Sequence, residues 1–379
     1  MGLAERKVCI IGGGVGGLTL ALSLQQRGIP CRVFEKYDHF QHHRTGFLIW
    51  SYAIKILQTL DVAVHEFGSP LEFFEVFGRK AQPISRMPIG VVSREHGAET
   101  YEMNRRSLMQ AMSEMVGDDL QAGKSCVAVD SSDSGAQVTF EDGSVYEADV
   151  VIGCDGAHSV VRKWVQPAAQ LNVFNAGGWI GVMDQHPAAL KPNCHMDFWE
   201  PSIKAGVADI GNGQARWYVG MNGRVPDKSS PIKTQILDAV PVLPDVLQQC
   251  LDATPESEMV EVVGADLPPL DPWFKGRVLM LGDAAHATSP YAGMGACSAI
   301  ADADCLAKLF SETDDWSHVF QAFQDERKPA ADAIVKDSRK SLNLSTGRSL
   351  LKNWIRDWGL EHIPEKQMHQ VVEDMVTGQ

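Results

Sequence analysis

Residues 8–17 read Val-Cys-Ile-Ile-Gly-Gly-Gly-Val-Gly-Gly, an apolar run that leads directly into a cluster of glycines. Glycines 12, 14 and 17 satisfy the pattern G-x-G-x-x-G, and the flanking residues predict a strand before the cluster and a helix after it. The first glycine lets the chain turn, the second lets backbone approach a pyrophosphate, and the third lets the helix pack against the strand. The stretch therefore predicts the start of a dinucleotide-binding unit.

An acidic residue stands where such a unit needs one. A second strand is predicted over 30–35 and ends in Glu35, where a carboxylate can accept hydrogen bonds from both hydroxyls of an adenosine ribose. The pyrophosphate would lie at the N-terminus of the helix predicted over 16–28, because free N–H groups and the positive end of the helix dipole face it there. The unit does not by itself separate FAD from NAD.

Two later motifs repeat the placement of an acid at the end of a buried strand. Asp155-Gly156 follows the run 149–153, and Gly282-Asp283 ends a second apolar run. Because ligands bind at the carboxyl ends of the strands in such folds, we expect both acids at one edge of one sheet. The chain contains only one complete G-x-G-x-x-G, which excludes a second dinucleotide-binding domain.

The three motifs resemble, in order and separation, those of the class A flavoprotein monooxygenases of the para-hydroxybenzoate hydroxylase type, over residues 7–345. The resemblance implies one non-covalently bound FAD, reduced by NAD(P)H that visits a surface groove. It also implies that a flavin C4a-hydroperoxide formed with O₂ hydroxylates an aromatic or electron-rich small molecule. Two alternatives stay open: a flavin-dependent reductase or dehydrogenase on the same fold, and a non-catalytic FAD-fold carrier.

The resemblance also assigns cofactor-binding residues along the chain. They are Gly12, Gly13, Gly14, Val15, Gly17, Glu35, Lys36, Arg44, Thr45, Gly46, Arg105, Val127, Asp155, Gly156, Gly282, Asp283, Pro290, Gly293, Met294 and Gly295. Many members have Gly-Gln-Gly where this chain has Gly293-Met294-Gly295, so the substrate cannot be carried over. No catalytic side chain is assigned, because the cofactor performs the difficult step in this chemistry.

Residues 171–270 read as short aromatic-rich segments broken by Gly, Pro and Asn, a pattern typical of a mostly β domain. Candidate substrate-pocket residues are Trp179, Trp199, Trp217 and Tyr291. Arg216 and Lys204 could orient an anionic substrate, but we expect them at solvated strand edges.

The predicted fold is α/β, with a Rossmann-like three-layer FAD-binding domain, a β-rich substrate domain and C-terminal helices. Helices are expected over 51–60, 105–116 and 295–310. Strands and loops are expected over 71–96 and a hairpin over 136–146. A helix break is expected at Pro329. The FAD-binding domain would comprise 1–70, 97–170 and 271–320, the substrate domain 71–96 and 171–270, and the helical segment 321–379.

Composition limits the partners. The formal net charge of -14 opposes binding of nucleic acid, and no apolar run reaches the ~18 residues of a membrane span. Eight scattered cysteines without a C-x-x-C pair, together with no secretion signal, favour a cytoplasmic enzyme whose partners are a small-molecule substrate and O₂. His39, His42 and His43 lack metal-ligand spacing, so no metal is predicted, and His286 is expected to support its loop. The oligomeric state is left open.

Overall fold

The computed structural model describes residues 6–38, 44–240 and 243–378. Its first sheet has six strands in the order β18-β19-β12-β1-β2-β8. Their bounds are β1 Val8–Ile11, β2 Cys31–Phe34, β8 Leu120–Gln121, β12 Val150–Gly153, β18 Phe274–Lys275 and β19 Val278–Met280. All neighbours pair in parallel except β18 with β19, so β1, β12 and β19 end at one edge, as the three motifs predicted.

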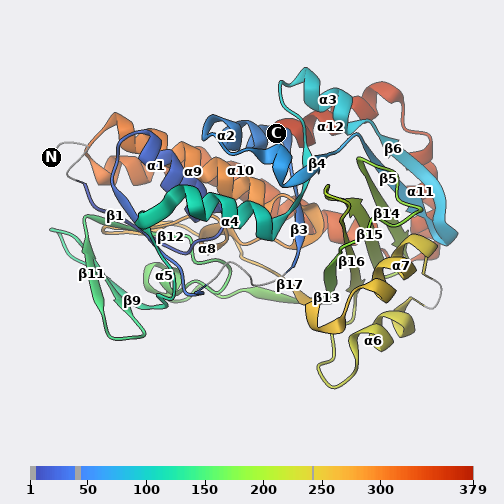
Figure 1. Cartoon of the computed structure of the whole chain (residues 1–379), viewed down its shortest axis with the longest axis horizontal. Coiled ribbons are helices and arrows are strands. Elements are labelled where there is room, and N and C mark those ends of the chain that lie inside the picture. Colours follow the sequence, from blue (N-terminus) through green and yellow to red (C-terminus); the bar gives the residue numbers. More distant parts are fainter. Residues whose placement is uncertain (1–5, 39–43, 241–242, 379) are drawn as a thin grey trace.

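Helices and a small sheet cover the two faces of this sheet, which gives three layers (Figure 1). One face carries α1 (Val15–Gln26), α2 (Ser51–Thr59), α4 (Arg105–Val116) and α9 (Gly295–Glu312). The other carries α5 (Val160–Val165) and a three-stranded sheet of β9 (Cys126–Ser131), β10 (Ala136–Phe140) and β11 (Val145–Ala148). Leu18, Leu20 and Leu24 are fully buried, so α1 forms because nearly its whole surface is apolar and packed.

A second large sheet has seven strands in the order β17-β13-β16-β15-β14-β5-β6. Their bounds are β5 Phe73–Gly78, β6 Gln82–Met87, β13 Asn172–Met183, β14 Cys194–Glu200, β15 Ile203–Asp209, β16 Ala215–Asn222 and β17 Val260–Asp266. Side chains alternate between its faces: Trp217, Val219 and Met221 pack toward α6 (Ile232–Ala239) and α7 (Asp245–Ala253). Arg216 and Tyr218 therefore point to the opposite face, toward the first sheet.

A small sheet connects the two large ones. It consists of β3 (Gly46–Ile49), β7 (Tyr101–Asn104) and β4 (Gly68–Pro70), with β7 in the middle. Single turns of 3-10 helix complete the connections: η2 (Val64–Glu66), η3 (Arg79–Ala81), η4 (Gly117–Asp119), η5 (Glu256–Glu258) and η6 (Pro290–Ala292). The predicted α/β class with a β-rich second part is confirmed, whereas the domain boundaries given above stay a prediction.

The C-terminal helices are α10 (Trp316–Ser345), α11 (Leu350–Glu361) and α12 (Glu365–Thr377). The predicted break at Pro329 is wrong, because α10 runs through that residue. A proline inside a helix removes one hydrogen bond and costs about 3 kcal/mol. Buried Phe320, Phe323 and Val335 on both sides of Pro329 hold the helix in place and outweigh that cost.

Two further stretches differ from the prediction. The region 71–96 contains the helix α3 (Ile89–Glu95), and the mostly β region 171–270 contains α6 and α7. These helices have 7 to 9 residues, and packing rather than intrinsic propensity fixes so short a helix. Within the described residues, no helix is long and apolar enough to cross a membrane.

Candidate active site

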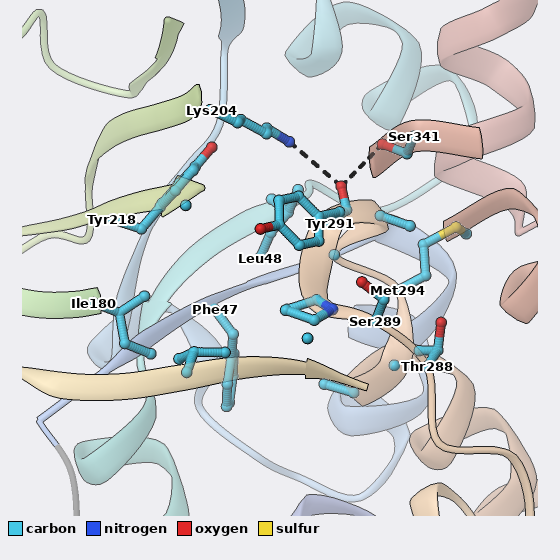
Figure 2. A pocket seen from close by; sticks show the side chains of 18 of the residues that line it. Phe47, Leu48, Ile180, Lys204, Tyr218, Thr288, Ser289, Tyr291, Met294 and Ser341 are labelled. Carbon is cyan, nitrogen blue, oxygen red and sulfur yellow. Dashed lines mark hydrogen bonds between the residues drawn. The ribbon is translucent and has the colours of Figure 1, made fainter. Parts of the chain in front are cut away.

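A cavity of about 1170 Å³ lies between the six-stranded and the seven-stranded sheet. Its wall draws on the glycine loop before α1, on β3, on the loop 288–294 and on the open face of β14, β15 and β16. Figure 2 shows Phe47, Ile180, Tyr218 and Tyr291 arranged around it. The two large sheets, and the motifs at the edge of the six-stranded one, therefore meet at this cavity.

The glycines of the first motif have two different structural roles. Gly12 has φ of +104°, and a Cβ there would lie 2.3 Å from the carbonyl oxygen of Cys154. A Cβ on Gly17 would lie 2.0 Å from the carbonyl oxygen of Gly12. The Cβ position of Gly14 has no described atom within 4 Å, and Gly14 lines the cavity. Two glycines thus serve the packing of strand and helix, while Gly14 keeps space open for a ligand.

Two helices start at this cavity with uncapped N-termini. The N-cap residues of α1 and α9, Gly14 and Met294, make no side-chain cap bond with any described residue, and neither first turn carries an acid. Each end therefore presents free N–H groups and about half a unit of positive charge. This donor set fits an anionic cofactor that reaches from one helix to the other.

Acidic and basic residues flank the two helix starts. Glu35 is buried at the end of β2, and its carboxylate accepts hydrogen bonds from the backbone N–H of Gly13 at 2.7 Å and of Tyr37 at 3.1 Å. These bonds hold the carboxylate beside the glycine loop. Arg105, at the start of α4, and Asp283, at the start of α8 (Asp283–His286), both line the cavity.

The Asp155-Gly156 motif works mainly through backbone contacts. The Asp155 carboxylate accepts hydrogen bonds from the N–H of Val160 at 2.6 Å and of Val161 at 3.1 Å, so it caps α5. Arg162 donates to the carbonyl oxygen of Ala284 at 3.2 Å, which ties α5 to α8. Gly156, rather than Asp155, lines the cavity.

The structure brings most of the residues predicted from the sequence to the cavity. Those on its wall are Gly14, Val15, Gly46, Arg105, Gly156, Trp179, Trp199, Gly282, Asp283, Pro290, Tyr291, Gly293, Met294 and Gly295. The remaining ones lie behind or beside the wall: Gly12, Gly13, Gly17, Glu35, Lys36, Arg44, Thr45, Val127, Asp155 and Trp217. Arg44 forms ion pairs with Asp184 and Glu258, and Val127 is half exposed on β9.

The aromatic candidates lie on different faces of the seven-stranded sheet, according to their position along the strands. Trp217 is buried on the face toward α7, where its Nε1 donates to the hydroxyl of Thr254 at 2.9 Å. Trp179 packs in the same core and reaches the wall at its edge. Trp199 stands on the cavity face and donates to Asp197 at 3.1 Å. The alternation of strand residues explains this division, since Trp217 and Tyr218 are neighbours with opposite directions.

A buried cluster of charged residues forms the cavity floor, and sequence reasoning missed three of its members, Glu102, His195 and Asp197. Glu102, on β7, accepts two bonds from Arg216, from Nε at 2.6 Å and from Nη2 at 2.8 Å. His195 lies between the two acids, with Nδ1 2.6 Å from Glu102 and Nε2 3.2 Å from Asp197. Lys204 pairs with Asp197 at 3.2 Å, and Tyr218 donates to the same carboxylate.

The electrostatics of the cluster keep both acids ionised. Burial by itself raises the pKa of Glu102, but the charges of Arg216 and His195 outweigh burial and hold that pKa down at about 2. Burial likewise opposes ionisation of Asp197, and Lys204 with His195 still lowers its pKa. These carboxylates are weak bases, so they anchor other side chains rather than take protons from a substrate.

The expectation of solvated strand edges for Arg216 and Lys204 is wrong. Their strands, β16 and β15, lie inside the seven-stranded sheet, and their side chains are 12% and 13% exposed. A lone basic residue on a strand is usually solvated. One sequence signal could have indicated this polar face. Residues with polar groups occupy alternate positions of β14, namely His195, Asp197 and Trp199, and they predict a polar inner face once the strand is known to be central.

His286 supports its loop, as predicted. Its Nε2 lies 2.6 Å from the carboxylate of Asp302, a buried residue of α9, and Asp302 also binds Arg327. Burial lowers the pKa of His286, but Asp302 outweighs this and raises it. The described residues contain no group of ligands suited to a metal ion. His39, His42 and His43 lie outside them.

The open space at the glycine loop, the two uncapped helix N-termini and the second sheet over the same cavity fit an enzyme that binds a dinucleotide cofactor such as FAD beside its substrate. The chain belongs to the FAD binding domain family, whose model matches residues 5–338. FAD is its cofactor, with NAD(P)H as the reductant typical of the family, and the protein is an FAD-dependent monooxygenase of the aromatic hydroxylase type.

Known proteins are similar over nearly the whole chain. Aurachin C monooxygenase/isomerase of Stigmatella aurantiaca is 28% identical over 356 residues, which cover 92% of each chain. An FAD-dependent urate hydroxylase of Klebsiella oxytoca is 24% identical, covering 93% of this chain and 94% of the relative. HpxO of Klebsiella pneumoniae, solved with FAD and uric acid, superposes with a TM-score of 0.91 at 22% identity, covering 100% of this chain and 98% of that one.

Proposed function

We propose that the substrate of this monooxygenase is an uncharged or weakly acidic aromatic molecule whose ring carries hydrogen-bonding oxygen or nitrogen atoms. The observation that carries the proposal is the pairing of Arg216, which lines the cavity, with the buried carboxylate of Glu102. Both bonds use Nε and Nη2, so Nη1 has no hydrogen-bond partner among the described residues and keeps two N–H donors for a ligand.

The pairing of charges in the floor supports an uncharged substrate. Each basic side chain has a carboxylate within bonding distance: Arg216 binds Glu102, Lys204 binds Asp197, and His195 lies between the two acids. A fully charged ligand would gain little from charges that already pair with one another, while losing its hydration. A ring oxygen or nitrogen that accepts one or two hydrogen bonds gains more than it loses.

The walls above the floor are apolar and suit a flat ring. Phe47, Ile180 and Tyr291 surround the space in Figure 2, and Tyr291 stands in the loop before α9. The carbonyl oxygen of Tyr291 accepts hydrogen bonds from Lys204 at 3.3 Å and from Ser341 at 3.0 Å, which fixes that loop between the sheet and α10. A ring can therefore lie against aromatic surface while its polar edge meets Arg216.

The division of labour follows from these contacts. Bound FAD would supply the redox chemistry: with two electrons from NAD(P)H and with O₂, one oxygen atom enters the substrate and the other leaves as water. Gly14, Met294 and the two helix starts would hold it by its phosphates and its ring system. The floor residues orient the substrate, and the apolar walls exclude water from the site of oxygen transfer. The urate hydroxylase relative supports one feature of the proposed substrate, a flat ring system with polar edges.

The thiols support a second part of the proposal, a reducing, cytoplasmic compartment. All eight cysteines are free, and six of them are buried.

A panel of oxygen-substituted aromatic compounds tests the substrate class. We expect a subset to stimulate NAD(P)H oxidation, and ¹⁸O₂ to leave one labelled atom in the product. Product formed without label, or formed equally well without oxygen, would show a dehydrogenase or reductase instead. A panel in which only strongly charged compounds stimulate turnover would contradict the reading of the cavity floor.

A further inference from the structure

Helix α11 carries an apolar stripe on the protein surface. Leu350, Trp354 and Trp358 follow one another at four-residue spacing, and Leu351 and Ile355 lie beside them. Trp354 and Trp358 are 65% and 55% exposed, and the other three side chains are each more than half exposed. Contiguous exposed apolar residues of this size mark an interaction surface, because a solvated helix face normally carries polar groups.

The surrounding segment is basic in an acidic protein. Residues 336–356 contain six lysines and arginines and one acid, Asp337, and the rest of α11 adds Asp357 and Glu361, so this part of the chain is net basic, whereas the whole chain has a formal charge of -14. Lys336, Arg348 and Lys352 are exposed and form no ion pair with any described residue. An amphipathic helix with tryptophans on one side and unpaired cations around it suits the interface of an anionic bilayer.

The same segment forms the mouth of the cavity. Asp337, Lys340 and Leu344, on the last turns of α10, line the cavity and are also exposed at the surface. The carbonyl oxygen of Leu344 accepts a hydrogen bond from Nη1 of Arg356 on α11 at 2.8 Å. The guanidinium of Arg356 also lies 5.1 Å from the ring centre of Trp199, a wall residue. Helix α11 is thus fixed to the rim of the active-site cavity. Figure 1 shows it beside β6, the edge strand of the seven-stranded sheet.

We propose that α11 and the basic segment 336–356 dock the protein on the surface of an anionic lipid bilayer, with Leu350, Leu351, Trp354, Ile355 and Trp358 inserted among the lipids. Docking places the cavity mouth at the bilayer, from which the proposed uncharged aromatic substrate enters past Leu344. The choice of substrate rests on the proposed function, whereas the docking surface stands on exposure and charge alone.

A second copy of this chain fits the surface less well. A two-fold dimer would place the basic segment of one copy against that of the other, so like charges would meet. A standard stable interface also takes about 800 Å² and roughly 20–30 residues from each partner, whereas the whole of α11 has 12 residues. A bilayer has the opposite charge and no such lower limit, because each inserted side chain adds its own transfer free energy.

Vesicle co-sedimentation of the FAD-loaded full-length protein tests the proposal. The probes are phosphatidylcholine vesicles with and without about a third of phosphatidylglycerol. We expect binding to the anionic vesicles and a blue shift of tryptophan fluorescence. The double variant Trp354→Ser/Trp358→Ser should lose at least about tenfold in partitioning. The matched control is Val173→Ser, which removes a 67% exposed apolar side chain on β13. FAD content and melting temperature show that each variant is folded.

Three outcomes overturn the proposal: no binding by the parent, equal binding by the double variant, or equal binding to vesicles without phosphatidylglycerol. Sedimentation velocity adds a fourth, a parent dimer that the tryptophan substitutions convert to monomer. The assay needs neither substrate nor NAD(P)H. Its failure would therefore leave the substrate proposal intact, and a negative substrate panel would leave the docking surface intact.

Discussion

Glu102 and Arg216 form a two-point ion pair between β7 of the small connecting sheet and β16 of the seven-stranded sheet, with N–O distances of 2.6 and 2.8 Å. Glu102 is 1% exposed and Arg216 12%. The pair therefore joins the part of the chain that carries the dinucleotide motif to the sheet that forms the substrate floor. The geometry of this ion pair sets both the stability of the contact between the two sheets and the direction of the free Nη1 donors.

The Glu102→Gln variant should be less stable by about 3–5 kcal/mol at neutral pH, because Arg216 is left buried without its counter-charge. The pKa of Glu102 is depressed from 4.5 to about 2, so its contribution is present above about pH 4.5 and is lost as the pH falls through 2. Urea unfolding between about pH 5 and 3 should show a smaller pH slope in the variant than in the parent. An equal slope would mean that other acids dominate this range.

The Lys204→Met variant should keep its FAD and lose coupling between NAD(P)H oxidation and hydroxylation. Lys204 bonds Asp197 and the carbonyl oxygen of Tyr291, so its loss frees the loop before α9 and unbalances the floor. We expect kcat/KM for hydroxylation to fall about ten- to hundredfold. Product formed per NAD(P)H consumed is the measurement. Lys308→Met, an exposed lysine on α9, is the control, and a similar loss there would refute the assignment.

Replacing Gly14 or Gly17 should separate cofactor binding from folding. The Cβ position of Gly14 is open to the cavity, so Gly14→Val should give a folded protein that fails to retain FAD. At Gly17 a Cβ would lie 2.0 Å from the carbonyl oxygen of Gly12, so Gly17→Ala should destabilise the fold itself. Circular dichroism with flavin content distinguishes the two. A Gly14→Val protein that holds FAD like the parent would move the cofactor away from this loop.

Trp217 and Tyr218 are neighbours on β16 that face opposite sides, and their substitutions should differ accordingly. Trp217→Phe leaves a gap in the core and the hydroxyl of Thr254 without its donor, so it should cost about 1–3 kcal/mol of stability with KM unchanged. Tyr218→Phe removes a donor to Asp197 on the cavity floor, so it should raise KM roughly tenfold with a smaller loss of stability. The reverse pattern would invert the assignment of the two faces.

Local sequence was sufficient to predict the first sheet and its edge. A glycine pattern between an apolar strand and an apolar helix has few alternative structures, because Gly12 and Gly17 each occupy a place that no larger residue fits. The positions of Asp155 and Asp283 could also be predicted, because each follows an apolar run that forms a fully buried strand. Only the β1–α1 unit forms through contacts close in sequence, because β1 pairs with β12 and β12 with β19 across more than 100 residues. The position of each acid at the end of an apolar strand still predicted that they share one edge.

The substrate floor was decided only by the tertiary structure. Glu102, His195, Asp197, Lys204 and Arg216 come from four strands of two sheets, and none of them belongs to a motif. Whether a charged residue on a strand meets water or a buried counter-charge depends on which strand pairs beside it, and pairing is a non-local choice. Pro329 is a second case in which the tertiary structure decided. Its residue type predicts a helix break, but α10 continues through it because the helix packs against the rest of the fold. The sequence by itself determined a dinucleotide-binding unit with two further acids at strand ends, and the resemblance of these motifs to a known family predicted FAD and the monooxygenase class. The position of β15 and β16 inside the sheet determined which side chains face the substrate, because it is burial that turns their charges into paired, directional donors.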